Sequence, residues 1–96
     1  MRKNLRGYNL FILEEALKEC GYRRLGYPSG FFGNDWMRGG YHVILREDRR
    51  GVIFHIHYDS KYHISPARKR GKDLEEEFKK INKMYRKKLI EHRSKI

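Results

Sequence analysis

Hydrophobic and polar residues alternate most regularly between Tyr41 and Asp59. Two runs rich in β-branched and aromatic residues flank the short charged turn Asp48–Gly51, which predicts a β-hairpin. Successive side chains of a strand point to opposite faces, so pairing Leu45 with Phe54 gathers the apolar side chains of both runs on one face. These residues are Tyr41, Val43, Leu45, Val52, Phe54, Ile56 and Tyr58. A slip of one residue would mix the two faces, and we therefore expect this register.

The opposite face of the hairpin is polar and carries three histidines. The same register places His42 opposite His57, and Ile44 opposite His55. The other polar members of this face are Arg46 and Asp59. An antiparallel sheet commonly packs one face on the core and leaves the other in solvent. We expect the apolar face to contact helices and the histidine face to stay open.

Apolar residues at helical spacing precede the hairpin. Intervals of three and four residues separate Leu10, Leu13, Leu17 and Cys20, which predicts one face of a helix. Asn9 is the expected N-cap. Gly21 is expected to end the helix in a left-handed conformation that lets Tyr22 pack back on the last turn. Cys20, the single cysteine, cannot form an internal disulfide, which fits a reducing cytosol, and its position favours a small core residue over a nucleophile.

A long basic helix is predicted at the C-terminus. Asp73 is its expected N-cap, with Glu76 completing a capping box. Its apolar stripe consists of Leu74, Phe78, Ile81, Tyr85 and Leu89. The polar face is almost wholly basic, with Glu91 as the exception, and contains Lys79, Lys80, Lys83, Arg86, Lys87, Lys88, Arg93 and Lys95. Residues 86–96 would either continue this helix or fray.

The segments between these elements have weaker patterns. Residues 1–8 form a basic arm or an early turn. One strand is expected within Tyr22–Tyr27, a turn at Pro28–Gly30, and a second short strand would fit Asp35–Arg38. Aromatic side chains lie among glycines at Phe31, Phe32 and Trp36. They would either cap a small core or form a base-stacking surface, and we favour the core.

Together these elements predict one α+β domain spanning residues 1–96. The order is a helix, a small antiparallel sheet of three or four strands, and the long basic helix. We expect both helices to cover the apolar face of the sheet. A chain of this length can bury a core of its own, and no internal repeat or second domain is indicated.

The charge of the chain is strongly one-sided. Lys and Arg number 23 against 12 Asp and Glu, a net charge of +11, which attracts nucleic acid first and an anionic membrane second. No signal peptide and no bilayer-spanning apolar run is present, so a cytoplasmic protein without a membrane partner is expected. The lack of Gln and Thr beside many Lys and Glu is typical of thermophiles. The predicted phosphate contacts are Arg68, Lys69, Arg70, Lys72, Lys79, Lys80 and Lys83.

Three segments resemble the HicA toxins of toxin–antitoxin pairs, which have the fold of double-stranded-RNA-binding domains. Residues 13–22, Leu-Glu-Glu-Ala-Leu-Lys-Glu-Cys-Gly-Tyr, are similar to the first helix of that family and its Gly-aromatic ending. Residues 39–44, Gly-Gly-Tyr-His-Val-Ile, are similar to its Gly-x-x-His segment at the start of a strand. Residues 70–74, Arg-Gly-Lys-Asp-Leu, are similar to its Gly-Lys-x-Leu sequence before the last helix. Tyr41 stands where the family usually has Ser.

The resemblance implies an activity, a partner and a binding site. HicA proteins are ribonucleases that use one histidine, which is His42 here, and they pair with an antitoxin protein. In double-stranded-RNA-binding domains, basic side chains at the start of the second helix contact phosphates across an RNA groove. The residues at the matching place in this chain are Arg68, Lys69, Arg70 and Lys72.

The histidines themselves suit acid–base chemistry, because the pKa of this side chain lies near neutral. His42 and His57 could take the proton of an RNA 2′-hydroxyl and protonate the leaving oxygen. Arg46 or Lys61 could neutralise the phosphate. Gly39 and Gly40 precede His42 and would let the backbone approach a ligand closely.

A metal site is the alternative use of the same face. His42, His55 and His57 have ligand spacing for a metal ion, and Asp59 or His63 could complete the site. Without a metal ion, these histidines would simply cover the sheet or contact phosphates. The sequence has no cofactor-binding motif. Three functions therefore stay open: a nucleic-acid-binding module, a metal-independent ribonuclease, and a metal-binding or protein-interaction domain.

Overall fold

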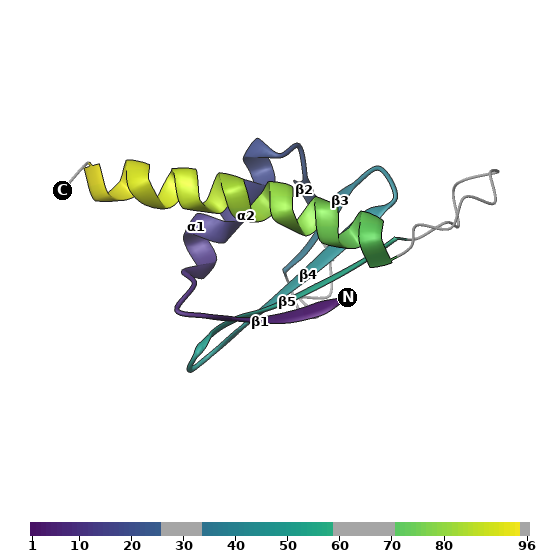
Figure 1. Ribbon diagram of the computed structural model, residues 1–96, viewed down its shortest axis with the longest axis horizontal. Coiled ribbons are helices and arrows are strands. Elements are labelled where there is room, and N and C mark those ends of the chain that lie inside the picture. Colours follow the sequence, from purple (N-terminus) through teal and green to yellow (C-terminus); the bar gives the residue numbers. More distant parts are fainter. Residues whose placement is uncertain (26–33, 59–70, 95–96) are drawn as a thin grey trace.

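The computed structural model describes residues 1–25, 34–58 and 71–94, apart from the side chains of residues 71 and 72. It forms a sheet with two helices on one side (Figure 1). In chain order the elements are β1 (Arg2–Arg6), α1 (Leu10–Glu19), β2 (Arg23–Arg24), β3 (Asp35–Arg38), β4 (Tyr41–Asp48), β5 (Gly51–Tyr58) and α2 (Gly71–Ser94). The predicted α+β fold is confirmed.

The sheet has five antiparallel strands in the order β1-β5-β4-β3-β2, where the sequence predicted three or four. β3 has the predicted bounds, Asp35–Arg38. The strand expected within Tyr22–Tyr27 is the two-residue β2. β1 corrects the prediction of an arm or turn at residues 1–8, because each residue of Arg2–Arg6 pairs with β5.

The central hairpin of β4 and β5 has the predicted register, with Leu45 opposite Phe54. Its turn is held by Asp48, whose carboxylate accepts hydrogen bonds from the backbone N–H groups of Arg50 at 2.8 Å and Gly51 at 3.0 Å. A short polar side chain that binds the backbone two or three residues on is a common way to fix a turn. The turn and the apolar pattern therefore specify the same register.

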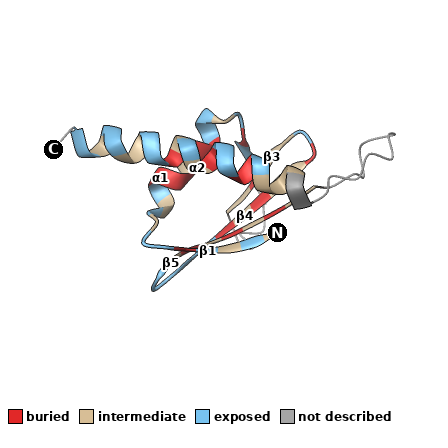
Figure 2. Cartoon of the chain, in the orientation of Figure 1, coloured by how far each residue is buried: buried red, intermediate tan, exposed pale blue. Residues whose placement is uncertain are grey.

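The apolar face of the sheet and the two helices enclose one core (Figure 2). Eight residues were predicted to be buried together, and all eight have at most 8% of their surface exposed: Leu13, Leu17, Val43, Leu45, Phe54, Ile56, Phe78 and Ile81. The remaining stripe of α2 also faces this core, since Tyr85 is buried and Leu74 and Leu89 are partly buried against it. The face assignment of the hairpin is confirmed.

Both ends of α1 have the predicted capping chemistry. The side-chain oxygen of Asn9 accepts a hydrogen bond from the third helical residue at 3.1 Å. Gly21 has a φ of 90°. The backbone N–H groups of Gly21 and Tyr22 donate to the carbonyls of Lys18 and Leu17 at 3.0 and 2.9 Å. This pair of bonds is a Schellman motif.

α2 begins three residues earlier than predicted. The helix starts at Gly71, so Asp73 lies inside the first turn and is not the N-cap. A carboxylate in the first turn is favoured by the helix dipole, which explains an acidic residue there without a capping role. The helix continues to Ser94, so residues 86–94 do not fray.

Trp36 and Cys20 are core residues. The ring of Trp36 is 1% exposed and its indole N–H donates to Asn34 Oδ1 at 2.8 Å, which excludes this ring from base stacking. Phe31 and Phe32 lie outside the described residues. Cys20 packs against the core, and burial raises the pKa of its thiol. A protonated thiol is a poor nucleophile.

A buried carboxylate connects the sheet to α2. Glu77 is 4% exposed, and its Oε1 accepts hydrogen bonds from the Tyr22 hydroxyl at 2.7 Å and from the guanidinium of Arg38. Burial and the hydrogen bond to Glu77 raise the pKa of Tyr22 well above its usual value, so this hydroxyl stays a donor. Because Tyr22 follows α1 and Arg38 ends β3, one carboxylate links three parts of the fold.

Phe54 provides a test of the core. Its ring has no exposed surface and lies edge-on to Phe78, with 5.0 Å between ring centroids. Phe54→Ala should lower the free energy of unfolding by about 3–5 kcal/mol, because it removes buried apolar surface and leaves a cavity. The matched control is Ile53→Ala, on the other face, which should cost clearly less. Chemical denaturation measures both, and equal losses would contradict the assignment of faces.

Candidate nucleic-acid interface and histidine pair

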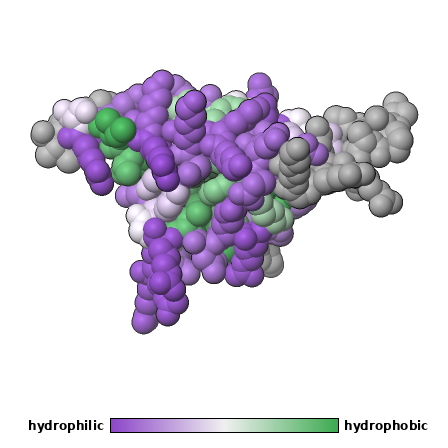
Figure 3. All heavy atoms as spheres, in the orientation of Figure 1, coloured by the Kyte–Doolittle hydropathy of each residue, from purple (hydrophilic) through white to green (hydrophobic). Residues whose placement is uncertain are grey.

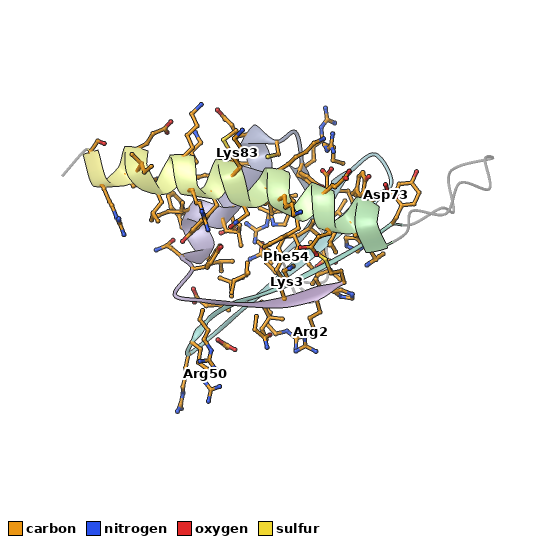
Figure 4. The ribbon with its side chains drawn as sticks, in the orientation of Figure 1. Arg2, Lys3, Arg50, Phe54, Asp73 and Lys83 are labelled. Carbon is orange, nitrogen blue, oxygen red and sulfur yellow. The ribbon has the colours of Figure 1, made fainter. Side chains whose placement is uncertain are left out.

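Basic side chains line the outer face of α2, opposite its buried stripe. We call them the helix stripe, which consists of Lys79, Lys80, Lys83, Arg86 and Lys87, all exposed. Figure 3 shows mainly hydrophilic side chains over this helix, and Figure 4 shows Lys83 pointing away from the sheet. The ammonium group of Lys80 lies 3.9 Å from the Glu77 carboxylate, so this charge is partly balanced. The other members are the stronger candidates for phosphate contacts.

The predicted interface is only partly within the described residues. Arg68, Lys69 and Arg70, and the side chain of Lys72, lie outside them. The predicted contacts that the structure describes are therefore those of α2, where Lys79 and Lys83 are exposed.

Neither described helix is both long and apolar enough to cross a membrane.

His42 and His57 contact each other on the sheet face away from the helices. They are cross-strand partners, and His42 Nδ1 lies 3.1 Å from His57 Nε2. The two rings are inclined by 68°, with 4.6 Å between their centroids. A hydrogen bond between two imidazole nitrogens holds one proton, so one ring donates and the other accepts. The structure thus brings together the two histidines that the sequence paired.

Asp35 lies on the other side of His42. Its Oδ2 is 3.3 Å from His42 Nε2, and the two side chains are 15% and 17% exposed. This contact lacks hydrogen-bond geometry, and the buried Nε2 atom has no hydrogen-bond partner among the described residues. Both nitrogens of His42 therefore face protein groups, Nε2 towards Asp35 and Nδ1 towards His57.

The glycines before His42 serve the fold and not ligand access. Gly40 is buried, and a side chain at this position would collide with the ring of Tyr58. Gly39 has a φ of 58° in the turn between β3 and β4, a left-handed conformation that favours glycine. The expectation that a ligand approaches the backbone here is wrong for Gly40, because Tyr58 occupies that space.

His55 is the third histidine of this face and pairs with Ile44 and with Arg2 of β1. Burial lowers the pKa of His55, and the positive charges of the N-terminus and of Arg2 contribute to the same shift. A histidine with a lowered pKa is neutral at pH 7. The position of Arg2 beside His55 was not predicted from the sequence, because β1 was not recognised as a strand. Arg46, the other cation expected on this face, is exposed, whereas Lys61 lies outside the described residues.

The metal alternative gains no support from the described residues. Within residues 1–25, 34–58 and 71–94, no three His, Cys, Asp or Glu side chains are arranged to hold a metal ion. His42 and His57 direct a nitrogen at each other, which competes with coordination of a shared ion. The proposed additional ligands, Asp59 and His63, lie outside the described part of the chain.

The helix stripe and the histidine pair lie on opposite sides of the molecule. In Figure 4, Arg2 lies on the side of the sheet away from α2, whereas Lys83 points outward from the helix. His42 alternates with the buried Val43 along β4, so its side chain faces away from the core. A ligand bound only to the helix stripe does not reach the histidines.

The lowered pKa of His55 predicts a pH effect. The unfolded chain takes up a proton at this residue below about pH 6.5, whereas the folded protein does so only at lower pH, so the free energy of unfolding should fall as the pH drops below that value. Arg2→Gln should raise the pKa of His55, because it removes a nearby positive charge. Arg23→Gln, in β2 at the far edge of the sheet, is the matched control. NMR titration of the imidazole measures both, and equal shifts would contradict the role of Arg2.

Comparison of the chain with protein-family models, with curated proteins and with solved structures finds no match. The resemblance to HicA toxins and double-stranded-RNA-binding domains therefore stays a prediction.

Proposed function

We propose that this protein binds nucleic acid, and RNA in particular, through its phosphates. The helix stripe is the observation that supports this function most directly. A helix dipole favours basic residues in the last turn, but the stripe starts at Lys79, in the interior of a helix that runs from Gly71 to Ser94. The dipole therefore does not account for it, whereas a polyanionic ligand does. The net charge of +11 acts in the same direction.

Phosphate binding by this stripe would depend on salt and little on sequence. Each Lys or Arg that neutralises a phosphate releases condensed counterions, so affinity falls steeply as salt rises. Backbone contacts carry no sequence information. α2 is anchored in the core by Phe78 and Ile81, so little ordering of the helix is required on binding. The other predicted contacts, whose side chains lie outside the described part of the chain, would bind phosphates in the same way: Arg68, Lys69, Arg70 and Lys72.

Removal of two stripe charges tests this function. Lys79→Ala with Lys83→Ala should weaken binding to single-stranded and duplex RNA of any sequence, because both lose phosphate contacts. The slope of log affinity against log salt should flatten by up to about one unit per lost contact. Fluorescence anisotropy over a salt series measures both quantities.

A charge-matched control separates contacts from net charge. Lys18→Ala with Arg24→Ala removes the same charge from exposed positions outside α2 and should leave the slope nearly unchanged. Equal effects of the two double variants would show that the stripe is not the interface. Absence of RNA binding by the unmodified protein at low salt would reject the function itself.

RNA cleavage without a metal ion is a second candidate, favoured by the 3.1 Å contact between His42 and His57. Such an activity would fit the HicA resemblance and with it a cytoplasmic toxin with an antitoxin-like protein partner. His57 would take the proton of a 2′-hydroxyl, whose oxygen then attacks the phosphorus. The bond to the 5′-oxygen breaks, and that oxygen takes up a proton from the pair or from water. The products are a 2′,3′-cyclic phosphate and a 5′-hydroxyl.

The roles of the two rings in this reaction would differ. His57 would contact the substrate, and His42, with one nitrogen against Asp35 and the other on His57, would orient it and share the added positive charge. Arg46 is an exposed cation on the same face and would neutralise the phosphate. The pair would act as one acid–base unit, because its two rings contact each other and do not flank a substrate.

Histidine variants test the second candidate. His57→Ala and His42→Ala should each lower RNA cleavage in the presence of chelator by about 10²–10⁴-fold while RNA binding is kept. His92→Ala is the matched control, because this histidine pairs with Glu15 at 3.0 Å on the helix side and should leave cleavage unchanged. If the unmodified protein binds RNA and cleaves none, the second candidate is wrong and the binding function stands.

A further inference from the structure

Four arginines from three strands share the sheet face that the helices leave uncovered. They are Arg2 and Arg6 of β1, Arg23 of β2 and Arg46 of β4. Each arginine pairs with a residue of a neighbouring strand that faces this side of the sheet. No described helix or strand covers this side, which we call the open face. The fold therefore creates a second basic surface, opposite the helix stripe. Two of its arginines come from β1, which was not predicted from the sequence.

Among the described residues, this face has two acidic side chains, Asp48 and Asp35, against four arginines, and both make contacts within the protein. Asp48 accepts two backbone hydrogen bonds in the hairpin turn. Asp35 is 15% exposed and lies against His42. Burial lowers the pKa of nearby His55, and the positive charges of the N-terminus and of Arg2 act in the same direction.

Apolar side chains lie among the arginines and form two adjoining hollows. One has a volume of about 240 Å³ and is lined by Arg2, Ile44, Arg46, Ile53 and His55. The second, of about 230 Å³, continues along β1 past Arg6 and shares Arg2 and Ile53 with the first.

We propose that the open face binds single-stranded RNA, with a base against Ile44 and Ile53 and the adjacent phosphates on Arg2 and Arg46. This inference deepens the proposed function and rests on it. An unpaired strand exposes flat bases that pack on apolar and ring surfaces while its backbone follows cations. A duplex presents phosphates and sugars instead, and it would leave the apolar floor without a partner.

The histidine pair lies within reach of an RNA strand bound in this way. Ile44 and His42 are two residues apart on the same face of β4, about 7 Å along a strand, and Ile44 pairs with His55. A nucleotide next to the one in the first hollow would therefore approach His57. The binding site and the candidate acid–base pair are parts of one surface.

The test compares a single-stranded RNA decamer of uridine with a blunt RNA duplex of mixed sequence. Arg2→Ala with Arg46→Ala should weaken binding of the single strand on the order of tenfold, because two phosphate contacts are lost, and should change duplex binding much less. Lys79→Ala with Lys83→Ala serves as the matched comparison and should weaken both ligands. Circular dichroism confirms folding, and Arg46→Ala alone, with a smaller loss, replaces the double variant if removal of Arg2 destabilises β1.

Each outcome separates this inference from the function on which it rests. Single-strand binding that persists unchanged in the arginine variants, or an equal loss for single strand and duplex, would overturn the open face as a single-strand site while leaving RNA binding intact. Failure of the unmodified protein to bind either RNA would overturn the proposed function. Without any substitution, the imidazole resonances of His55 should shift when the single strand is added, and unchanged resonances at saturation would contradict the site.

Discussion

The alternation of side chains along β4 and β5 is the constraint on which the rest of the molecule depends. Because Leu45 pairs with Phe54, every second residue enters the core and those between face the other side. A slip of one residue would put His55 in place of a ring that has no exposed surface, which would bury polar nitrogens without partners. β1 and β3 continue the same alternation through their pairing, which brings Arg2 and Asp35 to the histidine face.

The buried carboxylate of Glu77 fixes how the helices attach to this sheet. Taking a carboxylate out of water costs several kcal/mol, and the fold offsets this cost with the Tyr22 hydroxyl and the Arg38 guanidinium. An apolar residue would be expected to stabilise the site as well or better. The polar contacts instead specify one rotation of α2 about its axis. That rotation puts Phe78 and Ile81 in the core and turns the helix stripe outward.

Elements with a strong local pattern of apolar and polar residues could be predicted from the sequence, and elements with a weak pattern could not. The hairpin, its register and the contact of the histidine pair were predictable because the core-facing positions of residues 41–58 are nearly all apolar, although Ile44 and Ile53 interrupt the alternation on the other face. β1 was not, because Lys3 takes a core-facing position. Its ammonium lies 4.7 Å from the centroid of the Phe78 ring and 2.9 Å from Glu75, so an apolar stem packs where the sequence has a charged residue. Arg2 and Arg6 of the open face were missed with β1. Their position depends on the pairing of β1 with β5, a strand far away in the sequence.

The opposite positions of the helix stripe and the open face limit how one RNA molecule could use both. The core lies between them, so contacts to Lys79 or Lys83 cannot position a phosphate at His57 directly. Binding that is equal in the ground state and the transition state does not accelerate a reaction. A short RNA would therefore gain nothing for cleavage from the helix stripe and would depend on Arg2 and Arg46. A longer RNA that passes around an edge of the sheet would gain affinity from both faces, because the second contact becomes intramolecular. The dependence of affinity and cleavage on RNA length thus reports whether the two surfaces act on one strand.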